Sequence, residues 1–142
     1  MLRKKIEDLL LSVTKPARYI GGESGSVIKN KDNISVRFAF CFPDTYDIGM
    51  SHLGMKILYS LINQRADYWC ERVFAPGIDF EKLMRENRIP LYALESLDPL
   101  SEFDFIGFTM QYELSYTNVL NMLDLAGIPI LSKDRDDKLT NI

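Results

Sequence analysis

The stretch VRFAFCFPDTYDIGMSHLGMKILYSLI, residues 36–62, decides the fold of this 142-residue chain. Its first part, Val36 to Phe42, is apolar apart from Arg37, which is typical of a strand covered on both faces. Pro43 ends the strand, and Ser51 is the expected N-cap of a following helix. The buried stripe of that helix is expected to be Leu53, Ile57, Leu58, Leu61 and Ile62. The stretch therefore predicts a β-loop-α unit.

The loop between this strand and this helix is the first candidate site. In an open parallel sheet, ligands bind beyond the carboxyl ends of the strands, where the strand order reverses. His52 is the only histidine of the chain and falls at the start of the helix. It could ligate a metal or donate a proton, or it could simply cap the helix or pack. The candidate ligand-binding residues of this loop are Asp44, Tyr46, Asp47, Gly49, Ser51 and His52.

The segments before this unit predict a lead-in rather than a second core. Apolar residues recur at helical spacing in the first fourteen residues, and Ala17 to Ser26 reads as an irregular connection because it holds three glycines. Val27–Lys29 and Ile34–Arg37 flank a possible four-residue turn, which predicts a small hairpin.

The segments after this unit continue the alternation of strands and helices. Tyr68 to Ala75 predicts a strand, Asp79 could cap a helix that ends near Asn87, and Leu91 to Leu94 predicts a short edge strand. Phe105 to Met110 is expected to be a second central strand. A further helix is then expected, with Ser115 as its N-cap and Gly127 as its end. Its buried stripe is expected to be Tyr116, Val119, Leu120, Leu123 and Ala126. Ile128–Leu131 is expected to start another strand.

This order of elements predicts an α/β fold, a flavodoxin-like (Rossmannoid) doubly wound parallel sheet. The chain ends without the last helix and strand that a five-stranded sheet needs, so we expect it to be part of a longer protein. The loop after residues 105–110 should then face the first loop across one crevice, where it could wall a flat ligand. Its candidate ligand-binding residues are Thr109, Gln111, Tyr112 and Glu113.

Net charge, cysteine content and missing motifs exclude several classes of function. A formal net charge of −3 gives no broad attraction for nucleic acid or anionic lipid, and no apolar run is long enough to span a membrane. Cys41 and Cys70 lie in apolar strand-like runs, which favours reduced thiols and a cytoplasmic location. No GxSxG, Walker or GxGxxG motif follows the first strand. We expect no metal site and no catalytic residue in this chain.

Five stretches of the chain have distinctive sequences: RYIGGE (18–23), RFAFCFPDTYDIGMSHLGMKIL (37–58), ERVFAP (71–76), IPLYALES (89–96) and DFIGFTMQYELSYTNVLNMLDLAGIPIL (104–131). Together they resemble the N-terminal region of the cobalamin-binding-domain radical SAM proteins. The resemblance implies a cobalamin-binding-like domain over residues 26–142, after a lead-in over residues 1–25. It also implies a C-terminal radical SAM barrel with a [4Fe–4S] cluster and S-adenosylmethionine as the partner of this domain.

The sequence departs from the family pattern in two ways. The barrel's CxxxCxxC motif is not in this chain, so the chain cannot hold the cluster by itself. Cobalamin proteins with a histidine ligand carry DxHxxG, and that motif around His52 would need Asp at Met50 and Gly at Met55. If cobalamin binds, the resemblance favours a mode without histidine ligation.

Two rival functions remain from the sequence. A degenerate α/β interaction or scaffold module would bind no cofactor, and the absent DxHxxG favours it. A receiver-like phosphoacceptor would use Asp44 and Asp47, but it also needs an aspartate after the strand that ends at Met110, and Gln111 stands there.

Overall fold

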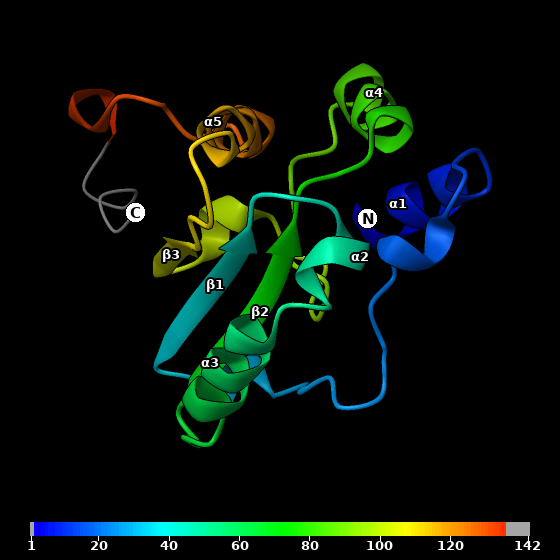
Figure 1. Ribbon diagram of the computed structural model, residues 1–142. Helices are drawn as coiled ribbons and strands as arrows, with labels where there is room; N and C mark the ends of the chain where they lie inside the picture. Colours follow the sequence, from blue (N-terminus) through cyan, green and yellow to red (C-terminus); the bar gives the residue numbers. More distant parts are fainter. Residues whose placement is uncertain (1, 136–142) are drawn as a thin grey trace.

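The structure is a computed structural model that describes residues 2–135. Its centre is a parallel sheet in the order β2-β1-β3, formed by β1 (Val36–Phe42), β2 (Tyr68–Phe74) and β3 (Phe105–Phe108). Figure 1 shows β1 between the other two strands. The register places Phe38 between Cys70 and Phe105. This strand order is that of the flavodoxin-like fold, so the predicted fold class and the predicted adjacency of β1 and β3 are confirmed.

Helices cover both faces of the sheet. On one face, α3 (Leu53–Asn63) and the short α2 (Tyr46–Gly49) lie over β1 and β2. Alternate residues of the strands, among them Phe40, Phe42 and Phe74, form the core there with Met55 and Tyr59. The other face carries α1 (Leu2–Leu10), α4 (Ile78–Asn87) and α5 (Ser115–Leu125) over a larger core.

Single turns of 3₁₀ helix connect these elements, at Pro16–Arg18, Lys31–Asn33, Leu100–Glu102 and Ser132–Asp134. The predicted hairpin before β1 is wrong, because residues 27–29 form no strand, although a turn does occur at Lys31–Asn33. Side chains rather than a strand ladder hold the segment before it. The backbone N–H of Val27 donates to the Tyr59 hydroxyl at 2.7 Å, and the Val27 carbonyl accepts from Trp69 Nε1 at 2.9 Å.

Two further expected strands are not formed. Leu91–Leu94 makes only one isolated bridge, from Tyr92 to Pro99, and the Leu94 N–H donates to the Arg72 carbonyl at 2.9 Å. Ile128–Leu131 follows the left-handed Gly127 (φ 69°), the predicted end of α5, but it does not pair with β3. Among the described residues β3 therefore pairs with β1 alone and lies at an edge, and is not a central strand.

The predicted buried stripe of α3 is also wrong. Met55 and Tyr59 face the sheet, whereas Leu53, Ile57 and Leu61 are 68%, 56% and 57% exposed. Leu58 is exposed as well, and only Ile62 of the predicted stripe packs against the core. The helix is apolar around most of its circumference, so periodicity alone could not choose its buried side.

Helix caps differ from the sequence prediction by one or two positions. His52, not Ser51, is the N-cap of α3, and Gly77, not Asp79, is the N-cap of α4. Ser115 is the first residue of α5 and not its cap. Of the predicted α5 stripe, Leu123 and Ala126 are buried and Val119 partly so, but Tyr116 and Leu120 are exposed.

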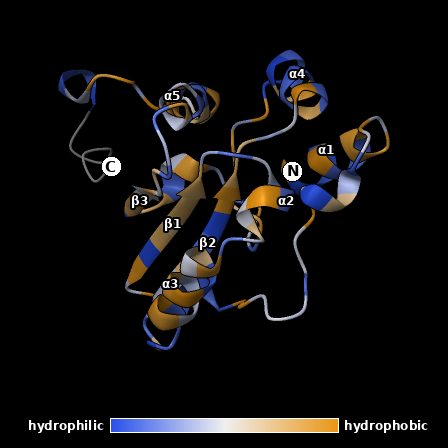
Figure 2. Ribbon diagram, in the orientation of Figure 1, coloured by the Kyte–Doolittle hydropathy of each residue, from blue (hydrophilic) through white to orange (hydrophobic). Residues whose placement is uncertain are grey.

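Two charged residues lie buried in the middle of β2, visible as a blue band in an otherwise orange strand (Figure 2). Glu71 is paired with Arg37, and Arg72 is paired with Glu95 at 2.6 Å and Glu23 at 2.9 Å. Because buried charges are costly unless they are paired, these contacts fix the segments on either side of β2. Arg72 in particular ties the loop around Glu23 to the sheet.

Candidate functional site

A crevice of about 290 Å³ lies at the carboxyl ends of β1 and β3. The loop after β1 and the loop after β3 leave the sheet from neighbouring strands, so their side chains meet above the sheet edge. The residues that line it are Phe42, Pro43, Asp44, Ile48, Ser51, His52, Gln111, Tyr112 and Ser115. The two predicted loops thus share one crevice, as the strand order requires.

His52 joins the two loops through both of its ring nitrogens. Nδ1 accepts the Met55 backbone N–H at 3.2 Å, which is the N-cap interaction of α3. Nε2 lies 3.1 Å from Gln111 Oε1. Because Nδ1 accepts, the proton of the neutral ring is assigned to Nε2, which donates to the Gln111 carbonyl oxygen. The capping interpretation of this histidine is therefore correct.

Further polar contacts connect the two loops. The Tyr112 hydroxyl donates to Asp44 Oδ2 at 3.5 Å, and Asn118 Nδ2 donates to the Pro43 carbonyl at 2.8 Å. Gln111 Nε2 in turn donates to the Thr109 hydroxyl. The Asp44 carboxylate is also held locally, since Oδ1 accepts the Thr45 N–H at 2.6 Å. These contacts give the crevice a polar rim of amide, carboxylate and phenol groups.

Five of the ten predicted ligand-binding residues do not line the crevice. Tyr46 packs edge-on against Phe74, with ring centroids 5.4 Å apart, and burial together with Glu23 raises the pKa of Tyr46 to about 12. Gly49 lies against the Phe74 ring, and a side chain at this position would collide with that ring. Glu113 is exposed beside the crevice. Thr109 accepts from Gln111 Nε2 but does not line the crevice itself. The fifth residue, Asp47, lines another cavity.

Asp47 belongs to a cluster with the lead-in segment. Its carboxylate pairs with Arg18 and with Lys15, and the hydrogen bond from Arg18 holds the pKa of Asp47 below its usual range. It lines a separate cavity of about 410 Å³ together with Tyr46 and with residues 15–18 and 20–23. Asp44 and Asp47 therefore do not form the acidic pair that a phosphoacceptor site needs.

Sequence reasoning missed part of the crevice wall. Phe42, Pro43 and Ile48 give it an apolar side, and Ser115 closes it from the start of α5. The position of Phe42 as the last residue of a strand could have indicated its role. The role of Ile48 could not be found, because the short α2 that turns it toward the crevice has no clear signal in the sequence.

Among the described residues, no three histidine, cysteine, aspartate or glutamate side chains gather closely enough to hold a metal ion. Cys41 and Cys70 are free and buried, and burial raises the pKa of both thiols. The same part of the chain has no helix with the length and hydropathy needed to cross a bilayer.

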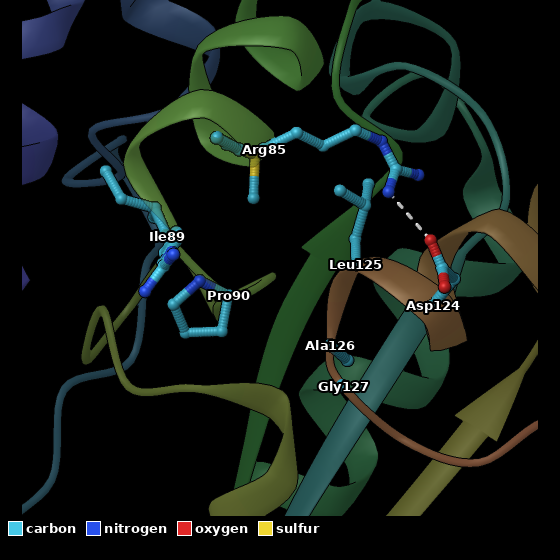
Figure 3. Close-up of a pocket in the computed structure, with 9 residues that line it drawn as sticks. Arg85, Ile89, Pro90, Asp124, Leu125, Ala126 and Gly127 are labelled. Atoms are coloured by element: carbon cyan, nitrogen blue, oxygen red, sulfur yellow. Dashed lines mark hydrogen bonds and ion pairs between the residues drawn. The ribbon is translucent and has the colours of Figure 1, made fainter.

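A third cavity, of about 360 Å³, lies between the C-terminal ends of α4 and α5 (Figure 3). Arg85 Nη1 donates to Asp124 across it at 2.7 Å, and the other Arg85 nitrogens are taken by Glu81 and Asn121. This cavity and the crevice share no lining residue. This network occupies all three nitrogens of the Arg85 guanidinium. The crevice is the better functional candidate, because it lies at the carboxyl ends of adjacent parallel strands.

The fold is that of a flavodoxin-like α/β protein, and the crevice lies between β1 and β3, where the strand order reverses. Residues 54–142, more than half of the chain, match the family described as radical SAM proteins, N-terminal. The chain therefore belongs to this family. The match includes the loop after β3 but begins just after His52. Neither a curated protein nor a solved structure is significantly similar to the chain.

Proposed function

We propose that this chain is a non-catalytic, cobalamin-binding-type domain of a radical SAM protein. It positions cobalamin next to a C-terminal barrel that carries the [4Fe–4S] cluster and S-adenosylmethionine. The observation that supports this proposal is the convergence of the loops after β1 and β3 in one crevice, in a chain of this family. Ligands of flavodoxin-like sheets bind at this place.

The residues of the crevice suit a flat ring system with amide side chains. Phe42, Pro43 and Ile48 offer an apolar wall to a ring, and Asp44, Gln111 and Tyr112 offer hydrogen bonds at its rim. Bound cobalamin would supply radical or group-transfer chemistry that the amino acids lack. This chain would hold and orient the ring, and Tyr112, half-exposed at the rim, would shield one side of it from water.

Histidine ligation of cobalt does not suit this crevice. Both nitrogens of His52 already have protein partners, Met55 N–H and Gln111 Oε1. A ligating nitrogen must be unprotonated, but the proton assigned to Nε2 is the one that holds Gln111. We therefore propose a binding mode in which His52 positions the two loops and does not touch the metal.

A spectrophotometric titration of the full-length protein with hydroxocobalamin tests the proposal. We expect saturable binding, and we expect His52→Ala to leave the spectrum of the bound form unchanged, because the histidine is not a ligand. Absence of any spectral change and of retained corrinoid in the wild-type protein would refute cobalamin binding. A bound spectrum that changes with His52→Ala would refute only the histidine-free mode.

A second candidate function is a cofactor-free interaction module. The exposed apolar side of α3, with Leu53, Ile57 and Leu61, favours it, because contiguous exposed apolar surface often marks an interaction site. This alternative predicts that the full-length protein binds no cobalamin. It also predicts that charged substitutions on α3 disturb the packing of the barrel against this domain, whereas substitutions in the crevice do not.

A further inference from the structure

A separate cavity of about 310 Å³ lies on the α3 face of the sheet, between α3 and the glycine-rich loop of the lead-in. It shares no lining residue with the crevice. Its lining residues are Ser24, Gly25, Gly49, Met50, Met55, Lys56, Tyr59, Ser60 and Arg72. The proposed function uses none of its polar groups, so the cavity needs an explanation of its own.

Arg72 supplies the buried polar group of this cavity. Its side chain is only 8% exposed, and two of its three nitrogens have strong partners. Nε donates to Glu95 at 2.6 Å, and Nη2 donates to Glu23 and Ser26, each at 2.9 Å. Nη1 donates only to the thioether sulfur of Met50, at 3.1 Å.

A thioether is a weak acceptor, so the hydrogen bond from Nη1 to Met50 does not replace the hydrogen bonds to water that Nη1 loses on burial. A buried donor of this kind costs free energy that a better acceptor would recover. The carboxylates of Glu95 and Glu23 occupy the other nitrogens of the guanidinium, and only Nη1 is left to meet an incoming acceptor. An oxygen that enters the cavity and replaces the sulfur would therefore be favoured.

The other groups around the cavity indicate the kind of oxygen. Lys56 lines it and forms no ion pair with any residue that the structure describes, so its charge is uncompensated. Two hydroxyls, from Ser24 and Ser60, can donate as well. Met50, Met55 and the ring of Tyr59 add apolar wall. Glu95 and Glu23 already balance the charge of Arg72, so Arg72 supplies only the Nη1 donor and Lys56 supplies the uncompensated cation. One such cation, the Nη1 donor, two hydroxyls and an apolar wall suit an acidic group on a small apolar body.

We propose that this cavity is a second binding site, for a small molecule that carries a carboxylate or phosphate on an apolar body. The acidic group accepts from Arg72 Nη1 and from Lys56, and the apolar body lies against Met55 and Tyr59. The glycine-rich loop closes over it, because Arg72 holds that loop through Glu23 and Ser26. The site is independent of cobalamin in the crevice.

Isothermal titration calorimetry of the full-length protein tests this site with three probes: benzoate, phenyl phosphate and the neutral benzamide. We expect saturable binding of at least one acidic probe and weaker or no binding of benzamide. The acidic probe that binds more tightly identifies the source of the acidic group. Equal binding of benzamide, or no binding of either acidic probe, would overturn the proposal.

Two variants locate the binding. Lys56→Gln is expected to weaken the acidic probe about two- to fivefold, as the loss of one exposed charge pair would. Lys82→Gln on α4, far from the cavity, is the matched control and is expected to change nothing. Ser60→Trp fills the mouth of the cavity and is expected to abolish binding. Circular dichroism establishes that each variant is folded, and binding that is unchanged in Lys56→Gln would contradict the site, whether or not Ser60→Trp folds.

Discussion

His52 begins α3 and holds the loop after β3 at the same time. Replacing it by alanine removes the N-cap, so we expect His52→Ala to lower the free energy of unfolding by about 1 kcal/mol. His52→Asn keeps a capping oxygen and should lose less. Urea unfolding of the three proteins measures the difference. Equal losses in the two variants would show that the cap is not what His52 contributes to stability.

Arg72 and Glu95 form a buried ion pair, and the carboxylate of Glu95 is fully buried. Arg72→Leu leaves that carboxylate without its partner, so we expect a loss of about 3–5 kcal/mol in the free energy of unfolding. The double variant Arg72→Leu/Glu95→Leu removes the unpaired charge and should be more stable than Arg72→Leu alone. Chemical denaturation checks both, and a double variant that is the less stable of the two would contradict this account.

At the scale of elements, α3 shows where sequence reasoning reaches its limit. Its existence could be predicted from the apolar run after the loop, but its buried side could not. Leu53, Ile57 and Leu61 have helical spacing, and so do Met55 and Tyr59. The tertiary structure decides between them, because the Tyr59 hydroxyl accepts from the Val27 N–H on the sheet side.

Substitutions on the two sides of α3 should therefore differ strongly. Met55→Ala removes a fully buried side chain and is expected to cost about 2–5 kcal/mol of unfolding free energy. Ile57→Gln changes an exposed position and should stay within about 0.5 kcal/mol of the wild type. Thermal and urea unfolding measure both. A larger loss for Ile57→Gln than for Met55→Ala would show that the side of α3 with Ile57, and not the side with Met55, packs on the sheet.

The attachment of the N-terminal segment to α4 should depend on pH. Asp79 Oδ2 accepts the Thr14 N–H at 2.9 Å, and this hydrogen bond holds the pKa of Asp79 below its ordinary value. A lowered pKa in the folded state means that the contact is present above the ordinary value, about 4, and is lost as the pH falls.

Amide hydrogen exchange at Thr14 measures this effect. Its protection factor should fall as the pH drops below about 4 in the wild-type protein. In Asp79→Asn, which cannot titrate, the protection factor should not follow the pH in this way. An identical pH profile in the two proteins would show that another group controls the contact.

At the scale of the whole molecule, the placement of the crevice could be predicted because it follows from strand order. Two β-loop-α units with adjacent parallel strands must bring their loops together, and Asp44 and Tyr112 do meet. The outward direction of Asp47 could not be predicted, since it depends on Arg18 in the lead-in, 29 positions away. Periodicity and loop composition do not report such a contact.

The edges of the sheet were also beyond sequence reasoning. Leu91–Leu94 and Ile128–Leu131 have strand-like composition, yet neither forms a strand. Leu91–Leu94 lies beside β2 and is held by single hydrogen bonds. Ile128–Leu131 follows the end of α5, where the Ile128 N–H donates to the Leu123 carbonyl. Strand propensity reflects a fit to a half-buried surface rather than a commitment to pair. Strands β1 and β2 were predictable because most of their residues are apolar and buried.

The central claim is that the crevice between the two loops seats a corrinoid. The most direct test is equilibrium dialysis of the full-length protein against hydroxocobalamin, with Tyr112→Ala and Tyr116→Ala as a matched pair. Both tyrosines are exposed, at 48% and 62%, but only Tyr112 lines the crevice. The account predicts that Tyr112→Ala weakens binding about three- to tenfold and that Tyr116→Ala leaves it unchanged. No binding by the wild type, or equal binding by both variants, would contradict it.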